Sequence, residues 1–415
     1  MNITGIITEY NPFHNGHLYQ IKKAKELGAS HIVVIMSGDF VQRGAPAIID
    51  KYARTQMALS CGADLVIELP VCFATSGAQY FARGAVAILD SLGIIDTLTF
   101  GCETTKHALL EKVAAYILEE PAEYKEIIHE ELKKGNSFPK AREIAIEKNI
   151  GKEASSLLSS PNNILALEYI MAIKLRNSKM TISPILREGN AYHETCLSEG
   201  IYASASAIRN VLTKHESFSD LKEYVPDTVF SILHNAYGKS FPVFTDDFSF
   251  LLQYALFQNE HCGYTKYADI HSDFSDKIKN ALYTYSNWEE LCNTLKSKDI
   301  TYTKISRALT HVLLNVCSSD LEDLSAMGYA PYARILGLGQ KGKELLSLIK
   351  KNSSLPIIIR VKEDMQQLDD MEKTLFEKDI FASHLYQSVI SKKFNIPFQN
   401  EFQRKLIQIE TGSYT

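Results

Sequence analysis

The chain has 415 residues, of which 45% are hydrophobic and 22% charged, and its formal charge is -5 at pH 7. These values are ordinary for a folded protein of two or three domains, and they exclude nucleic-acid binding through an overall positive charge. The seven cysteines form no C-x-x-C pair, which argues against a zinc ribbon or a disulfide framework. The strand pattern begins at residue 2 and the apolar runs are short, so we expect a cytoplasmic protein without a membrane partner.

The first 27 residues predict a strand followed by a helix. Residues 3–7 form an apolar run with the β-branched side chains of a buried strand. Pro12 interrupts this strand, because proline has no N–H for the ladder. From Gly16 onward the apolar side chains recur at the spacing of an amphipathic helix.

The junction between this strand and this helix carries His14, Asn15, Gly16 and His17. A helix N-terminus offers unpaired N–H groups and the positive end of its dipole, which together favour phosphate oxygens. Gly16 removes a Cβ that would hold a phosphate away from the backbone. Both histidines lie on one side of the first turn and are placed to donate hydrogen bonds to an oxygen on which charge builds up. The alternative is a helix cap with two incidental histidines.

Strands and helices then alternate through the first half of the chain. This alternation predicts an α/β fold with a Rossmann-like, doubly wound parallel sheet, and we place this domain at residues 1–215. Ligands bind such sheets at the carboxyl ends of the strands. A charged segment at about 106–150 predicts a helical insertion. The further strands are expected at 31–36, 64–69, 97–101 and 181–185, and the main helices at 50–60, 78–92 and 162–176.

A second motif follows the fifth strand. Ser204, Ser206 and Arg209 surround the start of a predicted helix. Hydroxyl donors, free amides and a fixed positive charge suit an anion such as a phosphate. The alternative is that Ser204 only caps the helix and that Arg209 is a surface residue.

Residues 216–415 predict a mainly helical domain. Lys304, Arg307 and His311 recur at helical spacing and share one side, and residues 334–343 are expected to form a glycine-rich turn with several basic side chains. This basic clustering suggests an RNA-facing surface, although a solvated helical face fits the composition equally well. The candidate RNA contacts are Lys304, Arg307, Arg334, Lys341 and Lys343.

The string His14-Asn15-Gly16-His17 resembles the HxGH signature of the nucleotidyltransferase superfamily, whose members are related to class I aminoacyl-tRNA synthetases. The longer string EYNPFHNGH at residues 9–17 resembles the bacterial tRNA(Met) cytidine acetate ligase family. The resemblance covers essentially the full length. It is most specific at residues 5–17 and 37–44 and weakest beyond residue 215. In this comparison Ser204, Ser206 and Arg209 match the second phosphate-binding motif of the superfamily.

This resemblance implies an activity. Acetate would attack the α-phosphate of ATP, with Mg²⁺ present, and give acetyl-adenylate and pyrophosphate. The N4 amine of the wobble cytidine of elongator tRNA(Met) would then take the acetyl group. His14 and His17 would stabilise the α-phosphate in the transition state. Lys22 would assist from the next turn, although a solvated helix face is the favoured reading for it, and Asp39 would either orient the acetate or the amine or simply cap the following turn.

The resemblance also implies the nucleotide contacts. No metal site formed by protein side chains and no DNA partner is expected. The residues expected to bind ATP are Ile7, Thr8, Glu9, Tyr10, Asn11, Pro12, Phe13, His14, Asn15, Gly16, His17, Leu18, Tyr19, Gln20, Gly101, Asn162 and Arg187, together with Ser204, Ser206 and Arg209.

Two other classes of function remain open from the residues. One is an adenylyl- or cytidylyltransferase that acts on a small molecule, and the other is a catalytically silent RNA-binding protein that kept the nucleotide fold. No P-loop and no GxGxxG follows a strand that the sequence predicts, and no GxSxG is present. P-loop kinases, dinucleotide enzymes and serine hydrolases are therefore disfavoured.

Overall fold

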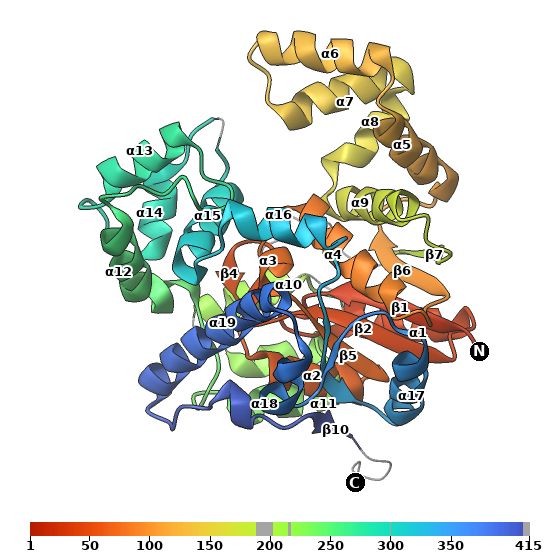
Figure 1. Cartoon of the computed structure of the whole chain (residues 1–415), viewed down its shortest axis with the longest axis vertical. Helices are drawn as coiled ribbons and strands as arrows, with labels where there is room; N and C mark the ends of the chain where they lie inside the picture. Colours follow the sequence, from red (N-terminus) through yellow and green to blue (C-terminus); the bar gives the residue numbers. More distant parts are fainter. Residues whose placement is uncertain (188–201, 215–216, 299, 410–415) are drawn as a thin grey trace.

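The computed structural model describes residues 1–187, 202–214, 217–298 and 300–409. Its centre is one large sheet with the strand order β10-β8-β5-β2-β1-β6-β7, and β9 pairs with β8 (Figure 1). All pairings in this sheet are parallel except that of β5 with β8. The strands are β1 (Ile3–Thr8), β2 (His31–Ser37), β5 (Leu65–Leu69), β6 (Thr97–Cys102), β7 (Thr181–Leu186), β8 (Ala333–Leu338), β9 (Ile357–Ile358) and β10 (Ile407–Gln408).

Helices cover both faces of the sheet because both faces of its central strands are apolar. Ile7 and Ile35 pack into one core with the helices α3, α4 and α9, whereas Ile6 and Val34 pack into a second core with α1, α2 and α10. Successive strand residues point to opposite faces, so a run of β-branched residues serves both cores. The covering helices are α1 (Asn15–Glu26), α2 (Lys51–Ser60), α3 (Val71–Ala74), α4 (Ala78–Ser91), α9 (Pro161–Leu175) and α10 (Ala205–Thr213).

A helical segment lies where we expected an insertion. It projects from the sheet domain above α9 (Figure 1). Its helices are α5 (His107–Glu119), α6 (Ala122–Lys133), α7 (Phe138–Asn149) and α8 (Lys152–Ser156).

The second half of the chain is mainly helical, as predicted, and the boundary expected at 215–216 lies outside the described residues. The helices α12 to α15 form a group beside the sheet around the buried Trp288 (Figure 1). The further helices are α11 (Asp227–Ala236), α12 (Ser249–Asn259), α13 (Ser272–Ala281), α14 (Trp288–Leu295), α15 (Tyr302–Leu314), α16 (Ser318–Ala326), α17 (Gly342–Asn352), α18 (Val361–Asp364) and α19 (Asp370–Phe394).

One element of this half differs from the prediction. We expected a glycine-rich turn to begin at Arg334, but the chain instead forms the fully buried strand β8, which pairs with β5 in the antiparallel direction. Gly337 permits this packing, because a Cβ there would lie 2.6 Å from Cγ2 of Thr55. The glycine therefore marks a close approach between elements and does not mark a turn.

The prediction of an α/β protein with a doubly wound sheet followed by mainly helical residues is confirmed. The described part of the chain contains no helix that is both long and apolar enough to cross a bilayer.

Candidate active site

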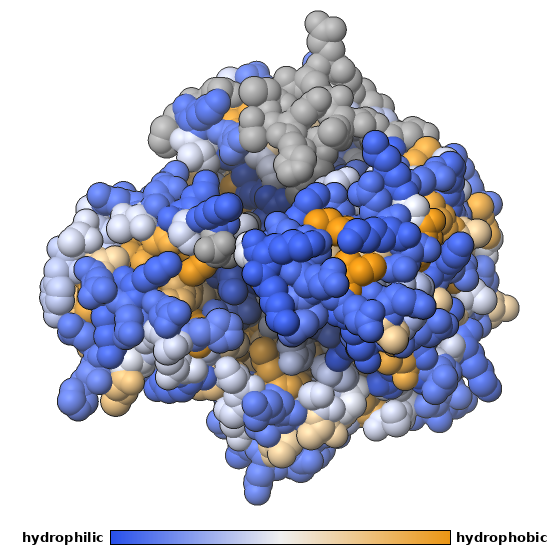
Figure 2. Space-filling view, turned by 90° about the horizontal axis from the view of Figure 1, so that it is seen from above, coloured by the Kyte–Doolittle hydropathy of each residue, from blue (hydrophilic) through white to orange (hydrophobic). Residues whose placement is uncertain are grey.

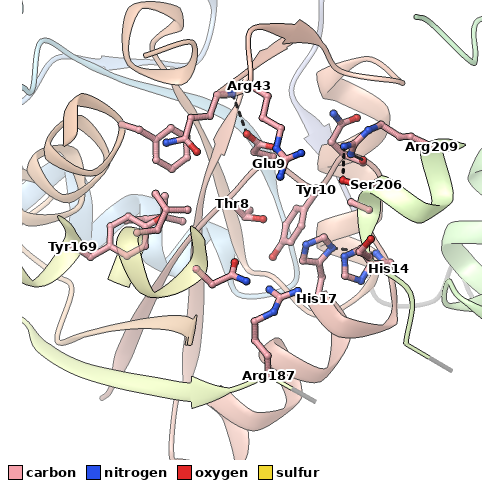
Figure 3. Close-up of a pocket in the computed structure, with 18 residues that line it drawn as sticks. Thr8, Glu9, Tyr10, His14, His17, Arg43, Tyr169, Arg187, Ser206 and Arg209 are labelled. Carbon is pink, nitrogen blue, oxygen red and sulfur yellow. Dashed lines mark hydrogen bonds between the residues drawn. The ribbon is translucent and has the colours of Figure 1, made fainter. Parts of the chain in front are cut away.

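A pocket opens at the carboxyl ends of β1 and β7, where parallel sheets bind ligands (Figure 3). Its cavity volume is about 170 Å³. Both sequence motifs contribute to it. The lining residues are Ile7, Thr8, Glu9, Tyr10, Asn11, His14, His17, Gln42, Arg43, Phe81, Asn162, Leu165, Tyr169, Arg187, Ser204, Ala205, Ser206 and Arg209.

The two histidines are both helix caps and pocket side chains. His14 is the N-cap of α1, and its Nδ1 accepts a hydrogen bond from the N–H of Gly16 at 3.1 Å. The Nδ1 of His17 accepts one from the N–H of His14 at 3.2 Å. A ring nitrogen that accepts carries no proton, so the proton of each neutral imidazole is on Nε2. Capping thus prepares each histidine to donate from Nε2.

The surroundings of His14 and His17 keep both rings neutral. Burial, reinforced by the charges of Arg187 and Arg209, lowers the pKa of His14 to about 3. Burial, with contributions from His14 and Arg187, also holds the pKa of His17 well below its usual value. The ring centroids lie 3.7 Å apart. The site is therefore positive through its arginines and the helix N-terminus, while the histidines act as neutral donors.

The second motif lies beside the histidines in the same pocket (Figure 3). Ser204 caps α10, where it accepts a hydrogen bond from the N–H of Ala207 at 3.1 Å, and it also lines the pocket. Arg209 is not an isolated surface residue: it donates to the carbonyl of Asn11 at 2.7 Å and to Oγ of Ser206 at 3.0 Å. Burial lowers its pKa to about 10, which leaves it charged at neutral pH. These contacts join the two motifs at one anion-binding end of the pocket.

Residues at the ends of β6 and β7 also line the pocket or support the residues that line it. Arg187 directly follows β7, and its N–H donates to the carbonyl of Cys102 at 3.0 Å. Gly101 does not line the pocket, but a Cβ there would lie 3.1 Å from Cγ of Arg187, so this glycine leaves room for the arginine. Asn162, at the start of α9, donates to the Glu103 carboxylate at 2.6 Å.

Part of the expected nucleotide segment supports the pocket without lining it. Phe13 packs its ring 4.6 Å from that of Tyr10. Asn15 donates to the carbonyl of Glu223 at 2.8 Å, away from the pocket. The expected contacts that do not line the pocket are Pro12, Phe13, Asn15, Gly16, Leu18, Tyr19, Gln20 and Gly101.

The structure places Lys22 and Asp39 outside the pocket lining. Lys22 is exposed on α1, on the side where its charge acts on the thiol of Cys61, and a role for it in catalysis stays a prediction. Asp39 is buried, and its Oδ1 accepts a hydrogen bond from the N–H of Lys51 at 2.8 Å. This contact is with the first residue of α2, whose N-cap is Asp50, so the carboxylate supports the start of that helix and the role expected for Asp39 in orienting a substrate stays a prediction.

Sequence reasoning missed several lining residues. Gln42 and Arg43 lie in the small hairpin between β3 (Phe40–Val41) and β4 (Ala45–Pro46), and the N–H of Gln42 donates to the Glu9 carboxylate at 3.0 Å. The family-like string at residues 37–44 was the signal for them. No motif marked the apolar members that helices contribute, namely Phe81, Leu165 and Tyr169.

A positioning residue was also missed. Arg54 of α2 is fully buried and donates to the carbonyls of Glu9 at 2.8 Å and Ser37 at 2.9 Å. It thereby holds the ends of β1 and β2 next to the pocket.

The candidate RNA contacts do not form one surface. Arg334 is 3% exposed and ion-paired with Glu401, so it is unavailable to RNA. Lys341 donates to the carbonyl of Ser30, just before β2 begins. Lys341 and its neighbour Lys343 therefore lie at the edge where the parallel strands start, opposite the pocket. They lie there because β8, the strand just before them, runs antiparallel to β5 and so ends at the edge where the parallel strands begin.

Lys304 and Arg307 lie on the pocket side. Both belong to α15, whose Ser306 donates to the carbonyl of Gly44 in the β3–β4 hairpin. Arg307 donates to the Asp269 carboxylate at 3.0 Å, which holds its guanidinium in place.

The sequence and the fold were compared with known proteins. Residues 1–401 match the family model described as HIGH Nucleotidyl Transferase. The chain is 43% identical to a tRNA(Met) cytidine acetate ligase of Thermoanaerobacter sp. (strain X514), over 93% of this chain and 95% of that protein. It is 40% identical to the tRNA(Met) cytidine acetate ligase of Acetivibrio thermocellus, over 93% and 94% of the two chains.

Solved structures agree with these matches. The crystal structure of Thermotoga maritima TmcAL in its apo form superposes with a TM-score of 0.92 at 32% identity, covering 99% of this chain and 100% of that chain. The same protein bound to alpha-thio ATP superposes with a TM-score of 0.89 at the same identity and coverage. Similarity of this extent, together with the paired motifs of the pocket, shows that the chain belongs to the tRNA(Met) cytidine acetate ligase family of HIGH nucleotidyltransferases.

Proposed function

We propose that this protein is an ATP-dependent ligase that activates acetate as acetyl-adenylate and transfers the acetyl group to N4 of the wobble cytidine of elongator tRNA(Met). One observation carries the proposal: two neutral histidines at a helix N-terminus line the same end of one pocket as Ser206 and Arg209. Phosphoryl chemistry needs this kind of positioning and positive charge more than it needs a protein nucleophile.

In the first step a carboxylate oxygen of acetate forms a bond to the α-phosphorus of ATP. The bond from that phosphorus to the bridging oxygen of the β-phosphate breaks, and its electron pair leaves with pyrophosphate. His14 and His17 donate from Nε2 to a non-bridging oxygen of the α-phosphate, on which charge increases. Arg209, Ser206 and Ser204 bind the leaving pyrophosphate.

In the second step the N4 amine of the cytidine attacks the acetyl carbon. The bond from that carbon to the AMP oxygen breaks, AMP leaves with the electron pair, and the amine loses a proton. The base must leave its stack to reach a pocket of this depth. Lys304 and Arg307, beside the hairpin that lines the pocket, are the proposed tRNA contacts. Seen from above, the molecular surface is mainly hydrophilic, with a recess between the group α12–α15 and the insertion (Figure 2).

Magnesium accompanies ATP in this proposal. Among the described residues, no group of three or more His, Cys, Asp or Glu side chains is placed to hold a metal ion. Mg²⁺ typically binds through substrate phosphates and retained waters, with one or two carboxylates. Its main ligands would accordingly be phosphate oxygens, and Glu9 is the carboxylate that lines the pocket. The proposed compartment is the cytoplasm, where this tRNA is modified.

The test is to incubate purified protein with ATP, labelled acetate and bulk bacterial tRNA and to analyse the nucleosides. N4-acetylcytidine that forms only when ATP and acetate are both present supports the proposal. Acetate-dependent ATP–pyrophosphate exchange without modified tRNA would retain the adenylation and reject the proposed acceptor. Transfer of an adenylyl group to a small molecule, without exchange on any carboxylate, would identify a small-molecule nucleotidyltransferase instead.

A further inference from the structure

Glu103 directly follows β6 and is bound to the start of α9 by two hydrogen bonds. Its backbone N–H donates to Oδ1 of Asn163 at 2.8 Å, and its carboxylate accepts from Nδ2 of Asn162 at 2.6 Å. Asn163 is buried, so the first of these bonds anchors the segment after β6 to the fold. Asn162 lines the pocket, whereas Glu103 is exposed and lies outside the lining. Glu103 therefore holds a pocket side chain from outside the pocket.

The Glu103 carboxylate determines how the Asn162 amide is turned. An ionised carboxylate only accepts hydrogen bonds, whereas a side-chain amide has an oxygen that accepts and a nitrogen that donates. If the amide were reversed, its Oδ1 would face the carboxylate and two acceptors would be in contact. The nitrogen must therefore point to Glu103. The amide then keeps Oδ1 and the second N–H of Nδ2 for another partner.

Asn162 shares one face of α9 with two apolar pocket residues. Leu165 and Tyr169 follow it by three and seven positions, so the three side chains lie on the same side of the helix, and all three line the pocket. Small-molecule sites typically combine an apolar wall with a few precisely placed polar groups. A purine base has flat faces and a hydrogen-bonding edge, and it matches this combination of apolar side chains and an amide.

The proposed phosphate contacts and α9 lie on different sides of the pocket. Figure 3 shows Ser206 and Arg209 beside the histidines and Tyr169 on the opposite side. In the proposed reaction the pyrophosphate leaves at Ser206 and Arg209, and the α-phosphate is bound at the histidines. The nucleoside then extends away from Arg209, toward the face of α9 that carries Tyr169.

We propose that Glu103 is a positioning residue for nucleotide selection: it holds the Asn162 amide with Oδ1 toward the base, where Oδ1 accepts a hydrogen bond from the N6 amine of adenine. This inference rests on the proposed use of ATP and adds to it the residues that select the base. An asparagine amide pairs with adenine through two bonds, since its oxygen accepts from the amine and its nitrogen donates to a ring nitrogen. Guanine carries a carbonyl oxygen in place of this amine, so Oδ1 would face a second acceptor. The fixed amide therefore admits ATP and rejects GTP.

The same carboxylate also acts on Arg187, another residue of the pocket lining. Desolvation by the surrounding protein lowers the pKa of Arg187, and the charge of Glu103 opposes this shift. The backbone N–H of Arg187 donates to the carbonyl of Cys102, the residue before Glu103, at 3.0 Å. Glu103 thus has two routes to the pocket, one through Asn162 and one through Arg187.

The test measures the ratio of kcat/KM for ATP to kcat/KM for GTP in acetate-dependent pyrophosphate exchange. Glu103→Gln replaces a pure acceptor with an amide that also donates, so Asn162 is free to turn. The ratio should fall by roughly 10- to 100-fold, which is the selectivity that a paired contact to a base supplies. Glu153→Gln is the matched control, because Glu153 is an exposed carboxylate on α8 that pairs with Lys106 in the same segment after β6. This control should leave the ratio unchanged.

A double-mutant cycle separates the two routes. Asn162→Ala removes the amide, so adding Glu103→Gln in that background should change the ratio by less than about twofold. If Glu103 acts through Arg187 instead, the full effect of Glu103→Gln persists in the Asn162→Ala background, and the proposal is overturned. Thermal melting of each variant separates loss of fold from loss of selectivity. Calorimetric binding of ATP and of GTP without acetate gives the same comparison independently of turnover.

The outcomes distinguish the two proposals. If the wild-type protein performs exchange but uses ATP and GTP equally, or if Glu103→Gln keeps the preference for ATP, the role of Glu103 is rejected and the ligase proposal stands. If the wild-type protein shows no exchange with any small carboxylate, the ligase proposal fails. The calorimetric comparison then still decides whether Glu103 sets the preference for ATP.

Discussion

Arg334 donates a hydrogen bond to Oε1 of Glu401 at 2.6 Å, and both side chains are almost fully buried. Lys51 lies 2.7 Å from the same carboxylate oxygen and 2.8 Å from Oε1 of Glu68. These four residues come from α2, β5, β8 and the segment before β10. Each buried charge is compensated because two cations pair with two carboxylates. These pairs also link the segment before β10 to α2 and β5 in the first half of the chain.

Substituting Glu401→Gln leaves two buried cations with one carboxylate. Breaking a buried pair in this way typically costs ~3–5 kcal/mol, so we expect the free energy of unfolding to fall by about that amount in urea titrations. Glu363→Gln is the control, because Glu363 forms an exposed pair with Arg360, and such pairs contribute ~0–1 kcal/mol. Although burial opposes it, the charges of Lys51 and Arg334 lower the pKa of Glu401 to about 2.

The sign of the pH dependence follows from that depressed pKa. The stabilisation by Glu401 is fully present above its unfolded pKa, near 4.5, and is lost as the pH falls toward 2. The difference in stability between wild type and Glu401→Gln should therefore shrink over that range. A difference that stays constant down to pH 2 would contradict the assignment of the ion pair.

His17→Asn should strongly lower kcat for exchange, whereas the free energy of unfolding should fall only slightly. Loss of one preorganised donor to a developing charge typically costs ~100- to 1,000-fold in kcat. The helix cap loses one hydrogen bond, which is worth about 1 kcal/mol of stability. The measurement is single-turnover acetate-dependent exchange alongside urea unfolding. The matched control is His129→Asn on the exposed face of α6, and equal losses of activity in both variants would show that His17 has no special role.

The exchange rate should not follow the titration of an ordinary histidine. Burial holds the pKa of His14 at about 3 and that of His17 well below 6.5. Both rings therefore stay neutral as the pH falls from 8 to 6, and kcat for exchange should be nearly constant over that interval. A fall centred near pH 6.5 that disappears in His17→Asn would mean that His17 titrates normally in the complex.

Lys304→Glu should weaken tRNA binding without affecting adenylation. Reversing a charge that contacts phosphate raises the KM for tRNA and reduces the slope of log affinity against log salt by about 1. Acetate-dependent exchange without tRNA should be unchanged. Lys350→Glu, on the exposed last turn of α17, supplies the control. If exchange falls together with tRNA binding, Lys304 has a structural role.

Elements and motifs with local signals could be predicted from the sequence. The apolar run before Pro12 and the helical spacing after Gly16 each depend on a few consecutive residues, because strand burial and helix amphipathicity impose their periods directly on the chain. The positions of Ser204, Ser206 and Arg209 around a helix start were readable for the same reason. The resemblance of residues 9–17 to the family string indicated the reaction.

Contacts between side chains that are distant in the sequence could be seen only once the fold was known. Strand β8 pairs with β5 across about 270 positions of sequence, and no local pattern separates its glycines from those of a turn. The directions of Lys22 and Asp39 depend on which helix packs beside them, which a sequence period does not specify. The hydroxyl of Tyr10, which has no hydrogen-bond partner among the described residues, has the same origin. Burial and hydrogen bonding are properties of the packed neighbourhood, and that neighbourhood is assembled from segments that are distant in the chain.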